Sequence, residues 1–132
     1  MREITLLGQN VNGYQGYWRS GKSAEVSLAQ LLFEFAKIEG LDLIRYTTSH
    51  PADMTKELIE THGSLDILAP FLHLPVQSGS NRILSRMNRR HSRDDYLRIV
   101  DKLVVQNAKL KLSSDFIVGF PGETDEDFMD TM

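Results

Sequence analysis

The segment that decides the fold is DFIVGFPGET at residues 115–124, where an apolar strand runs into a glycine- and proline-containing turn and then a helix start. In α/β folds, the carboxyl ends of parallel strands meet at one edge of the sheet, and ligands bind there. Gly119 and Gly122 carry no side chain, so the backbone at this turn can approach a bound molecule closely. The segment therefore predicts an α/β protein with a binding site beyond its strand ends.

Apolar runs recur along the chain at intervals of about 30 to 40 residues and alternate with helical patterns. The runs occupy residues 4–7, 41–46, 71–76 and 110–118. Such βα repetition predicts about four parallel strands with helices on their outer face. Because four strands cannot close a (β/α) barrel, we expect a partial TIM-like barrel.

Helix starts are marked by hydroxyl and carboxyl residues that can cap the first turn. Capping boxes are expected at Ser27 with Gln30, Ser92 with Asp95 and Thr124 with Asp127, and single caps at Asp53 and Ser80. The apolar residues that follow recur at helical spacing, and they predict core faces rather than a specific function.

Composition excludes several classes of protein. The chain has 132 residues, of which 41% are hydrophobic, so it fits one domain or part of a larger one. No apolar run approaches the roughly 18 residues of a membrane span, and no secretory leader opens the sequence, so we expect a cytoplasmic protein with no membrane contact. It has no cysteine, and its four histidines lack ligand-like spacing. We therefore predict no metal site within this chain.

The formal net charge of −3 means that any contact with nucleic acid would need a local basic patch. The candidate patch consists of Arg82, Arg86, Arg89, Arg90 and Arg93.

Residues 16–23, GYWRSGKS, match the P-loop pattern, in which Lys22 would reach a phosphate and Ser23 would hold magnesium. A P-loop follows its strand directly, whereas here residues 9–15 separate the apolar run from Gly16. We favour a long glycine-, serine- and aromatic-containing loop, and keep nucleotide binding through Gly16 to Ser23 as an alternative.

The segments after the four runs are rich in small, hydroxyl or amide-bearing residues. They lie at residues 8–10, 48–51, 77–80 and 119–123. These groups suit the binding of a polar organic cofactor rather than proton transfer. Strand alternation places Gln77 and Asp115 on faces that can both point into a barrel lumen, and we interpret His73 as a packing residue.

Four ordered blocks, at residues 6–12, 45–51, 71–80 and 113–124, together resemble the radical S-adenosylmethionine tRNA methylthiotransferases. The resemblance covers nearly the whole chain. The GQNVN and TSHP sequences, at residues 8–12 and 48–51, are similar to the tRNA branch. The branch that modifies a ribosomal protein remains the alternative.

The resemblance implies methylthiolation of C2 of N6-isopentenyladenosine at position 37, next to the anticodon. It implies S-adenosylmethionine, two [4Fe-4S] clusters, a tRNA substrate and a monomeric full-length enzyme. The cysteine motifs that hold the clusters in this family are absent, and so is the C-terminal RNA-binding domain. We therefore expect residues 1–132 to be part of one radical S-adenosylmethionine core domain and to be inactive alone. A noncatalytic fragment is the further alternative.

The resemblance also implies positions for the cofactor wall. Arg89 would pair with the methionine carboxylate, Asp115 would lie near the ribose, and no residue of the chain would be catalytic. His50 and Ser78 are candidates to face the substrate. The full set of expected cofactor-binding residues is Gly8, Gln9, Asn10, Gln77, Arg89, Asp115, Ile117 and Gly119.

Overall fold

The computed structural model describes residues 1–17, 25–47 and 49–132. Strand β1 (Glu3–Leu6) pairs in parallel with β4 (Leu43–Tyr46), and β5 (Phe71–His73) pairs in parallel with β6 (Lys111–Ser113). These strands overlap the four apolar runs, so the prediction of an α/β fold with parallel strands is confirmed.

The two strand pairs are linked through the segment that leads into β5. An isolated parallel bridge joins Ile44 of β4 to Leu68, and a second one joins Gln77 to Phe116 beyond the ends of β5 and β6. The four runs therefore follow one another across the molecule in chain order, as βα repetition requires. The described residues form an open arrangement and no closed barrel.

Strand β5 is shorter than the apolar run that predicts it, because its backbone ladder is interrupted after the N–H of Leu74 donates to the carbonyl of Ser113 at 2.8 Å. Pro75 has no backbone N–H to donate, and the N–H of Val76 donates to the Ser114 hydroxyl at 2.9 Å instead of to a backbone carbonyl. Backbone pairing resumes where the N–H of Gln77 donates to the carbonyl of Asp115 at 2.9 Å.

An antiparallel hairpin was not predicted. Strand β2 (Gln15–Tyr17) pairs with β3 (Glu25–Ser27), and Gly16 lies opposite Val26. The interpretation of residues 16–23 as a loop is therefore wrong at Gly16 and Tyr17, which belong to β2. Gly16 is an extended strand residue, while Lys22 and Ser23 of the P-loop pattern lie outside the described residues.

The described part of the chain has five α-helices and two short 3-10 helices besides the strands. Their bounds are α1 (Leu28–Phe35), α2 (Lys56–Ser64), α3 (Asn81–Arg86), α4 (Arg93–Gln106), α5 (Asp125–Thr131), η1 (Val11–Gly13) and η2 (Pro51–Asp53). Within these ranges no helix has the length and apolar character needed to cross a membrane.

The helix starts are mostly those that the sequence predicts. The three capping boxes form at the starts of α1, α4 and α5, and Ser80 caps α3. The prediction that Asp53 caps α2 is wrong, because Thr55 accepts from the N–H of Leu58 and takes that role. Asp53 instead lies in η2, where its carboxylate bonds other side chains.

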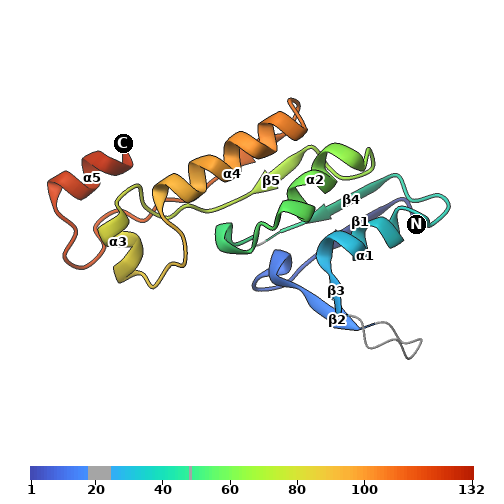
Figure 1. Cartoon of the computed structure of the whole chain (residues 1–132), viewed down its shortest axis with the longest axis horizontal. Helices are drawn as coiled ribbons and strands as arrows, with labels where there is room; N and C mark the ends of the chain where they lie inside the picture. Colours follow the sequence, from blue (N-terminus) through green and yellow to red (C-terminus); the bar gives the residue numbers. More distant parts are fainter. Residues whose placement is uncertain (18–24, 48) are drawn as a thin grey trace.

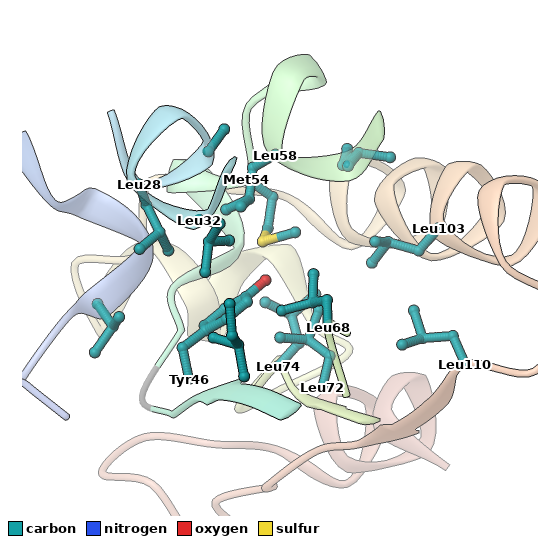
Figure 2. Close-up of a cluster of buried hydrophobic side chains, with 14 of the residues drawn as sticks. Leu28, Leu32, Tyr46, Met54, Leu58, Leu68, Leu72, Leu74, Leu103 and Leu110 are labelled. Atoms are coloured by element: carbon teal, nitrogen blue, oxygen red, sulfur yellow. The ribbon is translucent and has the colours of Figure 1, made fainter. Parts of the chain in front are cut away.

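The core lies between the strands and helices α1, α2 and α4, which run along them in Figure 1. Figure 2 shows Leu28 and Leu32 of α1 near Tyr46, while Leu103 of α4 lies farther along the same core. Ile44, Leu72 and Leu74 are fully buried, whereas Phe71, two strand positions from His73, is half exposed. One face of the strands is therefore packed, and the opposite face is left uncovered by the described residues.

Candidate functional site at the strand ends

The uncovered strand face carries a connected polar group beside the ends of β5 and β6. Nδ1 of His73 lies 2.7 Å from the hydroxyl of Ser113, its register partner on β6. Nε2 of the same ring lies 3.3 Å from Oδ2 of Asp115. The Asp115 side chain is 65% exposed, so most of the carboxylate remains open on this face.

Gln77 and Asp115 meet through their backbones. The N–H of Gln77 donates to the carbonyl of Asp115, and the N–H of Ile117 donates back to the carbonyl of Gln77 at 2.9 Å. Gln77 has a φ of +74°, which is uncommon for a residue with a side chain. Strained backbone of this kind clusters at binding sites, where surrounding bonds maintain it.

The turn after residue 118 has the open backbone geometry that its glycines predict. Gly119 and Gly122 have φ values of +76° and +80°, and a Cβ added to Gly119 would meet no atom within 4 Å. The amide of Gly119 is nevertheless occupied, because it donates to Oε2 of Glu123 together with the amide of Phe120. The backbone at Gly119 is open to a ligand, although its N–H serves the turn itself, whereas the Arg86 guanidinium lies against Gly122.

The segment after β1 is held against the segment after β4. The Asn12 side chain bonds both backbone groups of His50, at 2.8 Å each. Asn10 donates to Oδ2 of Asp53 at 2.6 Å, and Arg90 pairs with the same carboxylate at 2.9 Å. Gly8 and Gln9 are exposed between β1 and this contact.

Two histidine rings lie at the centre of this contact. His50 and His91 meet edge to face with their centroids 5.5 Å apart. Nδ1 of His50 accepts from the N–H of Ala52 at 3.1 Å, so the neutral ring carries its proton on Nε2. Burial lowers the pKa of His50, and the positive charge of Arg89 lowers it further. Burial also lowers the pKa of His91.

Arg89 provides a positive charge that acts on His50. Its backbone N–H closes the end of α3 by donating to the carbonyl of Leu84 at 2.9 Å. Asn88, immediately before it, adopts a left-handed φ of +57° that turns the chain. Within the described ranges the Arg89 guanidinium has neither a hydrogen bond nor an ion pair, so it is available to an anionic ligand.

The predicted basic patch is largely neutralised. Arg82 pairs with Asp127, Arg90 with Asp53, and Arg93 with Asp130 at 3.4 Å. These arginines therefore tie elements together and do not form a free cationic surface.

Ser78 differs from its expected role. Its side chain is fully buried, and its hydroxyl bonds the N–H of Ser80 at 3.1 Å and the Thr131 hydroxyl at 3.3 Å. The hydroxyl thus joins the segment after β5 to α5, so we correct the expectation that Ser78 faces a substrate.

Comparison with known proteins identifies the family. The model of the radical SAM superfamily matches residues 2–132. The chain belongs to this superfamily. It is 55% identical over all 132 residues to a tRNA-2-methylthio-N(6)-dimethylallyladenosine synthase of Bartonella bacilliformis, and covers 28% of that relative. Proteins of the same name from Ruegeria sp. and Agrobacterium fabrum are 53% and 56% identical over the same span, and the chain covers 29% of each.

The chain thus spans less than a third of the length of these relatives. Within the radical SAM fold, the structure divides the predicted site residues into two groups. Asn10, His50 and Arg89 adjoin one contact, whereas Gln77, Asp115 and Ile117 are joined by strand pairing. The polar contacts of His73 were not predicted, although the strand face that His73 shares with Gln77 was a usable signal.

The residues fit the two kinds of radical SAM cofactor differently. An unpaired guanidinium and an open carboxylate suit the carboxylate and hydroxyl groups of S-adenosylmethionine. No residue suits an iron-sulfur cluster, because the chain has no cysteine, and the described residues hold no group of three potential metal ligands.

Proposed function

We propose that this chain is part of an enzyme that methylthiolates C2 of N6-isopentenyladenosine at position 37 of tRNA. The sequence identity of 53% to 56% to synthases of this modification supports the reaction class. The structural observation that supports the proposal is the Arg89 guanidinium, which has no partner among the described residues and whose charge acts on His50, together with the open Asp115 carboxylate. In that enzyme, the role of this chain would be to bind and orient S-adenosylmethionine.

Arg89 would hold the methionine carboxylate through a bidentate, charge-assisted pair. Asp115 would accept hydrogen bonds from the ribose, while Ile117 and Gly119 would line the adenine. Gly8, Gln9 and Asn10 would lie near the methionine amino group. S-adenosylmethionine bound to a reduced cluster supplies one-electron chemistry, and the protein's task is then to position it and keep solvent out.

His50 is the candidate to face the substrate. Its Nε2 is free of the bond that occupies Nδ1, and its lowered pKa keeps the ring neutral at pH 7. A neutral Nε2–H is a hydrogen-bond donor that can face a base without adding charge.

The complete enzyme would carry two [4Fe-4S] clusters on cysteines outside this sequence, act on tRNA in the cytoplasm and function as a monomer. Alone, the 132-residue chain would be inactive, because it supplies no cluster ligand.

Binding of S-adenosylmethionine to the full-length enzyme tests the proposal. The enzyme is reconstituted anaerobically with its clusters and titrated calorimetrically without reductant. Arg89→Ala is expected to weaken binding at least tenfold, since it removes a charge-assisted pair. Arg93→Ala is the matched control, because Arg93 pairs with Asp130 and should leave affinity unchanged.

Equal affinity in the Arg89 and Arg93 variants would remove Arg89 from the site. Absence of S-adenosylmethionine binding by the wild type would contradict the proposed function. Magnesium-dependent ATP binding that is lost in Lys22→Ala would support the P-loop alternative.

A further inference from the structure

The contact of His73 with both Ser113 and Asp115 has no role in the core. His73 lies on the uncovered face of β5, whereas its neighbours Leu72 and Leu74 are fully buried on the opposite face. A polar group on the packed face would be explained by the need to satisfy buried atoms. On the open face, water could form hydrogen bonds with these side chains. Their contact with one another is therefore not needed to satisfy buried polar atoms, and its effect is to hold the side chains in a fixed orientation.

The arrangement fixes the ring first. His73 and Ser113 are register partners on parallel strands, and the 2.7 Å contact between Nδ1 and Oγ holds the imidazole plane. Nε2 faces the Asp115 carboxylate at 3.3 Å, and because an ionised carboxylate only accepts hydrogen bonds, this contact favours the tautomer with the proton on Nε2. In the neutral ring, Nδ1 then accepts from the Ser113 hydroxyl.

The ring in turn places one carboxylate oxygen. Nε2 of His73 lies 3.3 Å from Oδ2 of Asp115, and the side chain is 65% exposed. Since one oxygen faces the histidine, the other is directed away and remains open to accept hydrogen bonds from a ligand. A fixed acceptor of this kind suits the neighbouring hydroxyls of a ribose, which donate.

We propose that His73 is a positioning residue that orients the Asp115 carboxylate toward the ribose hydroxyls of S-adenosylmethionine, with Ser113 holding the imidazole in place. This inference rests on the proposed function, because it assumes that the nucleoside binds at Asp115. His73 itself need not touch the ligand.

The test is calorimetric binding to the cluster-containing full-length enzyme without reductant. Two ligands are compared, S-adenosylmethionine and its analogue that lacks both ribose hydroxyls. His73→Ala is expected to weaken binding of S-adenosylmethionine about tenfold. This is the effect of losing one well-placed hydrogen bond between a ribose hydroxyl and the charged Asp115 carboxylate. Binding of the analogue should change less than twofold, since it has no hydroxyl for Asp115 to accept.

Two replacements of intermediate length separate the roles of the two ring nitrogens. His73→Gln can place an amide N–H near the position of Nε2, and should restore affinity to within about threefold of wild type. His73→Asn reaches only the Nδ1 position beside Ser113 and should not restore it. Ser113→Ala, a small change outside the core, should weaken binding of S-adenosylmethionine about threefold and spare the analogue.

A double variant tests whether His73 affects binding through Asp115. In the Asp115→Ala background, His73→Ala should cause no further loss, because the group that it positions is gone. Equal loss for both ligands, or additive losses in the double variant, would overturn the inference and indicate a purely structural histidine. Wild-type affinity in His73→Ala would also overturn it while leaving the proposed function standing. Failure of the wild type to bind S-adenosylmethionine would instead refute both.

Discussion

The hydroxyl of Tyr46 lies 2.6 Å from Nε2 of His62, inside the core between β4 and α2. Both side chains are buried, and burial lowers the pKa of His62 to about 4. Burial also raises the pKa of the Tyr46 hydroxyl. The pair is therefore neutral across the physiological range, and each group satisfies the other in a region that water does not reach.

This pair makes stability depend on pH. Because the pKa of His62 is lowered on folding, the unfolded chain binds the proton more tightly, and stability falls as the pH decreases from about 6.5 to 4. The full change across this window is roughly 3 kcal/mol. Urea unfolding of wild type and His62→Gln at pH 7 and pH 5 checks this. The free energy of unfolding should change much less between the two pH values in the variant than in wild type. Equal changes in both proteins would contradict the assignment.

Truncation in the core should be costly in proportion to burial. Leu32 on α1 is fully buried, so Leu32→Ala should lower the free energy of unfolding by about 3 kcal/mol through lost burial and a cavity. Leu97 on α4 is 52% exposed, and Leu97→Ala should change the free energy of unfolding by less than about 1 kcal/mol. Urea denaturation compares the two, and similar losses would mean that the packing differs from that described here.

Docking of α5 depends on the absence of a side chain at Gly79. A Cβ at this position would lie 2.2 Å from the carbonyl oxygen of Asp130 and 2.7 Å from Cα of Thr131. Because both contacts are to backbone, Gly79→Ala should displace α5 and break the 3.0 Å bond from the Gly79 N–H to the Thr131 hydroxyl. Hydrogen exchange should then speed up throughout α5, whereas Ser64→Ala at the exposed end of α2 should leave it unchanged.

The histidine contact beyond β4 gives a spectroscopic test of the site geometry. Arg89 lowers the pKa of His50 more strongly than Arg90 does, in keeping with the pairing of Arg90 with Asp53. Arg89→Gln should therefore raise the pKa of His50, as measured by NMR titration of its ring protons. Arg90→Gln is the control and should shift it less. The opposite order would place Arg89 away from the strand-end edge.

Local signals in the sequence predicted much of this fold because they act within a few residues. The boxes at Ser27, Ser92 and Thr124 form as expected, since each needs only groups three residues apart. Asp53 had the same local potential as a cap, but Asn10 and Arg90 compete for its carboxylate across more than 35 residues. Thr55 was left free to cap α2.

The same distinction explains the candidate site. Strand alternation predicted that Gln77 and Asp115 can face the same lumen, and the structure adds that their backbones are bonded, because the two runs are parallel neighbours. The burial of Ser78 could not be foreseen, since it depends on Thr131, whose side chain lies 53 positions away in the sequence. The link between His73 and Asp115 likewise depends on the register of β5 with β6, which no local pattern specifies.

The most direct test of the central claim is mass spectrometry of tRNA nucleosides from a bacterial strain that lacks this methylthiotransferase activity and expresses the full-length protein. Wild type should convert N6-isopentenyladenosine to its 2-methylthio derivative, whereas Arg89→Ala should leave most of it unconverted. Accumulation of unmodified N6-isopentenyladenosine with wild type, together with methylthiolation of a ribosomal protein, would contradict the claim and favour the other branch of the family.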